Sequence, residues 1–182
     1  MPRQRTILRE NILDASMELL RSSGFSHFTA RQIAIKMNSS TQPIYKEFKN
    51  MEDLKVGLLE YIKHYLSEKV FIIQNATDAL GEVCNNYILF AKKEPVLFSA
   101  IFMDRELEAV QLHDYSYEKI ENIVIENASK CIDDKIDPFL NTLWPAIHGV
   151  AILVAQGKIN YDEDQINKKV KEIVDISMST LD

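Results

Sequence analysis

Glycine and proline are scarce in this 182-residue sequence, with five of each, and long gaps separate them. Strands need frequent turns, which these two residue types usually supply, so their scarcity favours helices. Apolar residues make up 46% of the chain and charged residues 26%, as in a globular protein with a sizeable core. We therefore expect an all-α fold.

Apolar residues recur at helical spacing along the chain, and the breaks between them predict about nine helices. The first helix covers 7–20 and ends before Gly24, the second begins at Thr29, and the third covers 41–48. A fourth helix is expected over 50–74. The remaining helices are expected at roughly 77–92, 95–104, 115–133, 138–157 and 163–181.

Two short helices near the N-terminus are joined by a predicted tight turn. Thr29 and Gln32 have the spacing of a capping box, in which each side chain bonds the backbone N–H of the other residue. Asn38 tolerates the left-handed backbone of a turn, Ser40 is placed to cap the third helix, and Pro43 suits its first turn. Helix pairs joined by about three residues are typical of a helix-turn-helix, although many other helix pairs share this pattern.

Residue types and spacing together make the interpretation of this region more specific. The relevant stretches are Gly24-Phe25, Phe28-Thr29-Ala30-Arg31-Gln32-Ile33-Ala34, Met37-Asn38-Ser39-Ser40, Ile44-Tyr45 and Phe48-Lys49-Asn50-Met51-Glu52-Asp53-Leu54. Over residues 8–55 this pattern resembles the TetR family of bacterial repressors. The sequence departs from the family at Asn38, Gln42 and Lys49, where glycine, a small residue and proline are usual. The later resemblance is loose and rests on Pro95-x-Leu97-Phe98 and Trp144…His148-Gly149.

The resemblance implies a helix-turn-helix DNA-binding head at residues 1–50 and a helical-bundle body for ligand binding and dimerisation at 51–182. The third helix would enter the major groove, where Gln42 would pair with adenine and the Thr41 methyl would contact thymine. The other candidates would reach phosphate or base: Thr29, Ser40, Tyr45, Lys46 and Lys49. Alternatively, Thr29 and Ser40 are only helix caps and both lysines are only solvated cations.

Charge is divided unevenly along the chain. Residues 1–50 hold eight basic and four acidic side chains, a net charge of +4. Because the whole chain has a net charge of −6, residues 51–182 carry −10. A basic head on an acidic body suits a polyanionic partner at one end only.

Several other functions lack their sequence signals. The sequence has no glycine-rich phosphate loop and no Cys-x-x-Cys or His-Glu-x-x-His motif, so we expect no enzyme, cofactor or metal site. His64, His113 and His148 lie far apart, and the acidic clusters Asp133-Asp134 and Asp162-Glu163-Asp164 suit a solvated surface.

The expected compartment is the cytoplasm. Cys84 and Cys131 suit two buried thiols in a reducing environment. No uninterrupted apolar run reaches about 18 residues, and the start of the sequence lacks the apolar stretch of a signal peptide. We therefore expect no membrane partner.

Most aromatic residues lie in the body, where the family encloses an apolar cavity for a small inducer. The candidate ligand contacts are Tyr87, Phe98, Phe102, Trp144 and His148. The alternative for these residues is plain core packing. A ligand would act on the fourth helix, whose Tyr61, Tyr65 and Phe71 are expected to face the cavity.

The helix at 138–157 is apolar nearly all round, and the next helix carries an apolar stripe at helical spacing. The stripe consists of Ile166, Val170, Ile173, Val174 and Ser177. In the family these two helices pair with those of a partner, which predicts a homodimer through residues 138–181; burial within one chain is the alternative. The expected function is a repressor released from a palindromic operator by a small apolar ligand. The second possibility is an all-helical protein-interaction module without an inducer.

Overall fold

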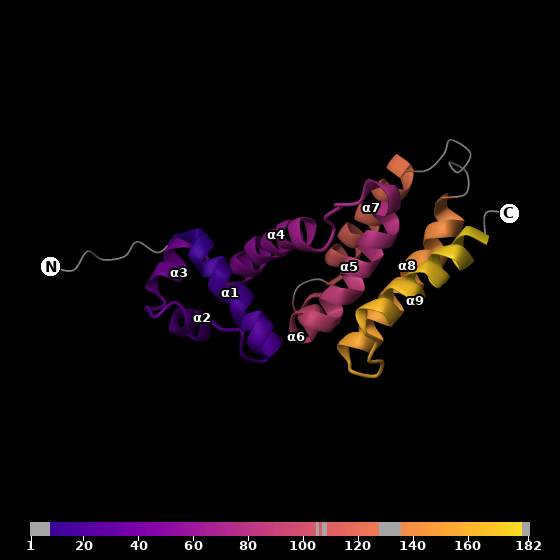
Figure 1. The fold of residues 1–182 in the computed structure, drawn as a ribbon. Coiled ribbons are helices and arrows are strands. Elements are labelled where there is room, and N and C mark those ends of the chain that lie inside the picture. Colours follow the sequence, from indigo (N-terminus) through magenta and orange to yellow (C-terminus); the bar gives the residue numbers. More distant parts are fainter. Residues whose placement is uncertain (1–7, 105, 107–108, 128–135, 180–182) are drawn as a thin grey trace.

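The computed structural model describes residues 8–104, 106, 109–127 and 136–179. This part of the chain consists of helices and connections without strands, which confirms the expected all-α fold (Figure 1). Four features of the sequence lie outside the described residues: Arg3, Arg5, Cys131 and Asp133-Asp134.

The helices follow one another along the chain with short connections. In order they are α1 (Arg9–Ser23), η1 (Gly24–His27), α2 (Ala30–Lys36), α3 (Gln42–Glu47), α4 (Met51–Lys69), η2 (Ala76–Asp78), α5 (Ala79–Lys93), α6 (Pro95–Phe102), α7 (Ala109–Asn127), α8 (Ile136–Ala155) and α9 (Glu163–Met178). The η elements are 3₁₀ helices.

Local sequence signals account for several helix ends. Gly24 follows α1 with a φ of 58°, a left-handed value that glycine adopts without strain. The Asn50 side chain accepts a hydrogen bond from the backbone N–H of Asp53 at 2.8 Å and so caps α4. Asp162 and Gln165 form a complete capping box at the start of α9.

Among the described helix ends, the end of α4 and the start of α7 differ most from the sequence predictions. Helix α4 ends at Lys69 because Val70 and Phe71 both bond the carbonyl of Leu66 and bury their side chains. The predicted continuation to residue 74 is therefore wrong. Helix α7 begins at Ala109 rather than near residue 115, in a stretch that contains no glycine or proline to delay it.

The helices form two groups that α4 connects (Figure 1). Helices α1 to α3 lie at one end, and α5 to α9 form a bundle at the other end. Within the bundle, α5 packs against both α8 and α9. At the other end of the molecule, α1 packs against α4 and also against α6. The head therefore contacts the body through α6 as well as through α4. A division of the chain at residue 50 remains a prediction.

Helix α8 differs from the expectation that no segment is long and apolar enough to cross a membrane. It has 20 residues and contains an 18-residue window with a mean hydropathy of 1.4, so by length and composition alone it meets that test. In the fold, one side of α8 packs against α5 and α9, with Leu140, Leu143 and Ile147 fully buried. Core helices of bundles also meet this test of length and composition, so the test alone does not assign α8 to a membrane.

The apolar stripe of α9 is largely covered within the chain. Ile166, Val170, Ile173 and Ser177 are buried in the bundle, and Val174 is half-buried. The alternative to dimerisation, burial inside one chain, therefore accounts for most of this stripe. Any contact of α9 with a second subunit would use other residues.

Candidate DNA interface and ligand site

The turn between α2 and α3 is built by the backbone around Asn38. Asn38 has a φ of 51°, as expected for a residue that replaces glycine in a left-handed turn. Its N–H bonds the carbonyl of Ile35 at 3.0 Å, and the N–H of Ser39 bonds the carbonyl of Ala34 at 2.9 Å. This is a Schellman motif, which ends α2 sharply and directs the chain into α3.

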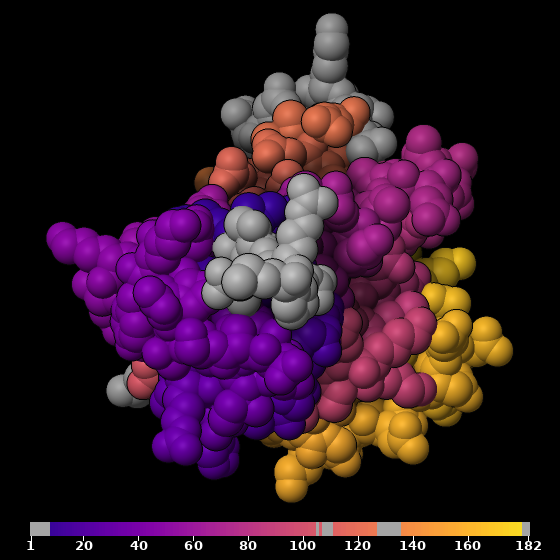
Figure 2. Space-filling model, turned by 90° about the vertical axis from the view of Figure 1, so that its left-hand side faces the viewer, coloured from indigo at the N-terminus to yellow at the C-terminus, as the bar shows by residue number. Residues whose placement is uncertain are grey.

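Helix α3 has one buried and one exposed face. Ile44 and Phe48 are each 1% exposed and anchor the helix end against the core of the head. The opposite face consists mainly of polar side chains in solvent. Figure 2 views the molecule from the side on which this head lies.

Most of the predicted DNA contacts are exposed to solvent. Thr29, Ser40, Gln42, Tyr45, Lys46 and Lys49 are exposed, and Thr41 is half-buried. Tyr45 is 54% exposed, which is high for a large aromatic residue. Within the described part of the chain, the side chains of Gln42, Tyr45 and Lys46 have no hydrogen-bond or ion-pair partner. They are therefore available to an external partner.

The predicted caps in the head are only partly confirmed. The Thr29 hydroxyl accepts a hydrogen bond from the N–H of Gln32 at 3.3 Å, but among the described contacts the Gln32 side chain does not return the bond. The prediction that Ser40 caps α3 is wrong. Thr41 holds the N-cap position through its carbonyl, which accepts from Ile44 and Tyr45, because the chain already turns helical at Thr41. Its hydroxyl makes no capping bond.

The five predicted ligand contacts meet in one aromatic cluster in the body. Tyr87 lies at its centre, with ring centroids 5.0 Å from Trp144, 5.5 Å from Phe102 and 5.6 Å from Phe98. His148 stacks on Trp144 at 5.6 Å. Tyr87 and Phe98 are fully buried, and Phe102 and Trp144 nearly so. Whether these residues also line a ligand site stays a prediction.

The polar atoms inside this cluster pair with one another. The Tyr87 hydroxyl lies 2.9 Å from Nδ1 of His148. Burial raises the pKa of Tyr87 well above its usual value, so the hydroxyl keeps its proton. Burial, with a contribution from the nearby His113, lowers the pKa of His148 to about 4. His148 is therefore neutral at pH 7, and we infer that its Nδ1 accepts a hydrogen bond from the Tyr87 hydroxyl.

Sequence reasoning missed His113, which joins the cluster from α7. Its ring centroid lies 4.6 Å from that of His148, and its Nε2 donates to the carbonyl of Phe102 at 3.1 Å. The two histidines are far apart in the sequence, so only the packing of α7 against α6 and α8 reveals the pair. Among the described residues, no group of three His, Cys, Asp or Glu side chains could hold a metal ion.

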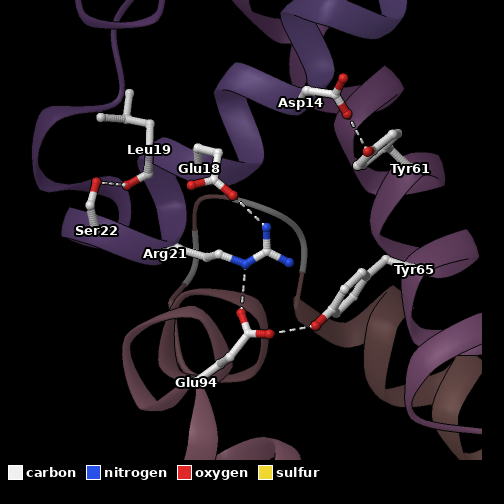
Figure 3. A network of polar contacts seen from close by, with 8 residues as sticks. All are labelled: Asp14, Glu18, Leu19, Arg21, Ser22, Tyr61, Tyr65 and Glu94. Carbon is white, nitrogen blue, oxygen red and sulfur yellow. Dashed lines mark hydrogen bonds and ion pairs between the residues drawn. The ribbon is translucent and has the colours of Figure 1, made fainter. Parts of the chain in front are cut away.

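A polar network links the head to the body where α1, α4 and α6 meet (Figure 3). Nε of Arg21 donates to Glu94 at 2.7 Å, and Nη1 donates to Glu18 at 2.7 Å. The other Glu94 oxygen accepts from the Tyr65 hydroxyl at 2.5 Å. Because Glu94 is the N-cap residue of α6, its carboxylate connects the start of that helix to both α1 and α4.

This network changes the predicted surroundings of α4. The Tyr61 hydroxyl donates to Asp14 of α1, and the Tyr65 hydroxyl faces Glu94 rather than the aromatic cluster (Figure 3). The expectation that both tyrosines face a cavity in the body is therefore wrong for their hydroxyl groups. Phe71 does reach the cluster and stacks on Tyr87 at 6.1 Å, although it lies beyond the end of α4.

An open surface hollow of about 790 Å³ lies between η1 and α6. It is lined by Phe25 and Ser26 on the head side and by residues such as Val96, Ser99 and Met103 on the body side. None of the predicted ligand contacts lines it. The hollow and the aromatic cluster are therefore separate features.

Comparisons with known proteins agree with this architecture. Residues 12–56 match the family model for bacterial regulatory proteins of the tetR family. The sequence matches no functionally curated protein. Among solved structures, the chain is similar to a TetR-like transcriptional regulator from Rhodococcus sp. RHA1, with a TM-score of 0.66, 19% identity and 98% of each chain covered.

Two further solved structures have the same fold. The flavonoid-responsive regulator FrrA has a TM-score of 0.68 at 16% identity, over 94% of this chain and 95% of that chain. NalD, the secondary repressor of the MexAB-OprM multidrug efflux pump in Pseudomonas aeruginosa, has a TM-score of 0.62 at 16% identity, over 94% of this chain and 93% of that chain. At such identities these structures show the fold, while the family model identifies the head. Residues 12–56 therefore have the N-terminal sequence pattern of the tetR family of bacterial regulatory proteins, and the chain as a whole has the fold of TetR-like regulators.

Proposed function

We propose that this protein is a cytoplasmic transcriptional repressor that binds an inverted-repeat operator as a homodimer. The observation that carries the proposal is the exposed face of α3. The side chains of Gln42, Tyr45 and Lys46 are exposed there and have no hydrogen-bond or ion-pair partner within the described residues. The turn at Asn38 precedes α3 and directs the chain into this helix. In a helix-turn-helix, side chains at these positions reach base edges and phosphates.

Selection of bound sequences from random duplex DNA tests this proposal directly. We expect an enriched inverted repeat, whose two halves are each read by one α3 helix. Elution from a DNA column should depend steeply on salt, since Lys46 and Lys49 would release counterions from phosphates. If no sequence is enriched and retention is weak at low salt, a protein-interaction module would be the better description.

The proposed dimer would use apolar side chains that the chain leaves uncovered. On α8, Leu153 is 40% exposed and Val150 is half-buried. On α9, Ile176 is 62% and Met178 is 47% exposed. A two-fold dimer through these helices would be isologous, which is why the operator should be an inverted repeat. Light scattering at micromolar concentration that shows only a 21.0 kDa species would overturn this part of the proposal.

We further propose that a small apolar ligand releases the repressor from DNA. Support comes from the aromatic cluster, which combines apolar rings with one buried polar pair, Tyr87 and His148. FrrA, which shares the fold, is described as flavonoid-responsive. Because His148 is neutral and the body carries excess negative charge, we expect neutral or cationic ligands rather than anions.

The proposed switch runs through Glu94. Phe98 and Phe102 of the cluster lie on α6, so a ligand that displaces this helix would pull Glu94 away from Arg21 and Tyr65. The head would then tilt and change the distance between the two α3 helices. Coupling of about 1–3 kcal/mol would weaken DNA binding roughly 5–150-fold.

Trp144 provides a test of the ligand because it is the only tryptophan and lies in the cluster. A panel of neutral and cationic apolar compounds should quench its fluorescence and raise the melting temperature. A Glu94→Gln variant should still bind a ligand, but the ligand should lower the DNA affinity of this variant less than that of the wild type. If no compound changes either signal, constitutive DNA binding would be preferred to the ligand-released model.

A further inference from the structure

Arg9, the first residue of α1, lies across the C-terminal end of α3. Its Nη1 donates to the carbonyl of Glu47 at 3.2 Å, and its guanidinium carbon lies 4.0 Å from the centre of the Phe48 ring. Glu47 is the last residue of α3, and Phe48 is its C-cap. Arg9 therefore bonds a helix-end carbonyl and stacks on the residue that ends the same helix.

Helix α4 meets this contact at Gly57. A Cβ atom at position 57 would lie 2.8 Å from Nη2 of Arg9 and 3.0 Å from Cε1 of Phe48. Glycine inside a helix is less favourable than alanine, so its presence in the middle of α4 calls for a reason. The close approach of Arg9 and Phe48 provides that reason, because any side chain would push the guanidinium out of its place.

We propose that Arg9, Phe48 and Gly57 form a clamp that sets the orientation of α3 relative to α4. Arg9 is then a positioning residue for DNA recognition, acting through α3 rather than on the DNA. The clamp holds the end of α3 opposite to Gln42, so a small displacement there would tilt the base-reading end. The inference rests on the proposed DNA-binding function, because its readout in DNA affinity requires an operator.

Two substitutions distinguish the clamp from the alternative that Arg9 only attracts DNA phosphate by its charge. Arg9→Lys keeps the positive charge but loses the planar guanidinium that stacks and donates in a fixed geometry. Gly57→Ala changes no charge. If Arg9 only attracted phosphate, both variants would bind DNA as the wild type does, whereas a clamp is damaged in both.

The DNA experiment measures affinity for the selected operator and its salt dependence in these variants and in Arg9→Ala. We expect Arg9→Lys and Gly57→Ala each to lower operator affinity about tenfold. This is the size of loss expected when one side chain that contacts a base is misplaced. Their salt slopes should stay unchanged. Adding Gly57→Ala to Arg9→Ala should cause a smaller loss than Gly57→Ala causes in the wild type, because the methyl group then meets Phe48 but no guanidinium. Val56→Ala, at an exposed neighbouring position of α4, is the matched control and should bind normally.

Thermal unfolding tests the clamp without DNA. In the Arg9→Ala background the guanidinium is gone and only Phe48 remains close to the new methyl group, so Gly57→Ala should affect the melting temperature more favourably than in the wild-type background. In the wild-type background the same substitution should give no increase or a decrease. An equal increase in both backgrounds, with unchanged operator affinity, would overturn the clamp. If wild-type protein enriches no DNA sequence, the proposed function fails, and the unfolding comparison still decides whether the clamp exists.

Discussion

The exposed face of α3 and the aromatic cluster of the body are both candidate sites, yet they are built in opposite ways. The α3 face comes from one short segment, residues 40–49, most of whose polar side chains lie in solvent. The cluster combines side chains from α5, α6, α7 and α8, and its rings are packed against one another. One site belongs to the surface, and the other is part of the core.

This difference separates binding from stability in the two regions. Exposed polar side chains contribute little to the free energy of unfolding, so substitutions on α3 should change DNA binding and leave folding intact. Buried rings contribute strongly through packing, so any substitution in the cluster should affect the fold before it affects a ligand. Salt should act mainly on the head, and pH mainly on the cluster.

The largest expected effect is in the core. Phe98→Ala removes a fully buried ring and should lower the free energy of unfolding by about 3–5 kcal/mol, measured by urea denaturation. The contrasting variant is Tyr45→Ala on the exposed face of α3. This substitution should change the free energy of unfolding by less than about 0.5 kcal/mol. Similar costs for the two variants would remove the distinction between the regions.

On the head, Gln42→Ala should relax preference at one base pair in each half-site. The loss of a bidentate contact to a base is expected to cost roughly 1–3 kcal/mol in binding free energy, with no change in the unfolding midpoint. The measurement is repeated selection from random DNA with the variant. An unchanged motif would show that Gln42 does not read a base.

Acid should weaken the cluster through His148. The pKa of His148 is about 4 in the fold and about 6.5 when unfolded, so between these values only the unfolded state binds the proton. Stability should therefore fall as the pH decreases from about 6.5 to 4. After allowance for partial exposure, we expect a loss of about 1–2 kcal/mol.

The control for this effect is His148→Gln, which cannot titrate in that range. Its unfolding free energy should depend less on pH across this window than that of the wild type. The same pH dependence in both proteins would assign the effect to other groups.

The smallest effect is expected from a single phosphate contact. Lys49→Ala removes one exposed cation and should weaken binding to all DNA sequences about equally. The slope of log affinity against log salt should decrease in magnitude by about one unit. A loss confined to the operator sequence would instead place Lys49 among the base-reading residues.

Most of the head could be predicted from residues close together in the sequence. Asn38 makes the left-handed turn, Asn50 caps α4, and Gly24 ends α1, because each acts on backbone groups within a few residues. The wrong prediction that Ser40 caps α3 also has a local cause, because the backbone is already helical at Thr41, which takes the N-cap position. Pattern and spacing were sufficient here because the interactions themselves are short-range.

The body shows where such reasoning stops. Aromatic residues were expected to gather there, but the contact between His113 and His148 and the bond of Glu94 to Tyr65 join residues far apart in the chain. Helix periodicity shows which face of a helix is apolar, not which other helix will cover it. The packing of α6 against α7 and α8 decided which helices meet in the cluster. The same packing buries His148 and thereby keeps it neutral.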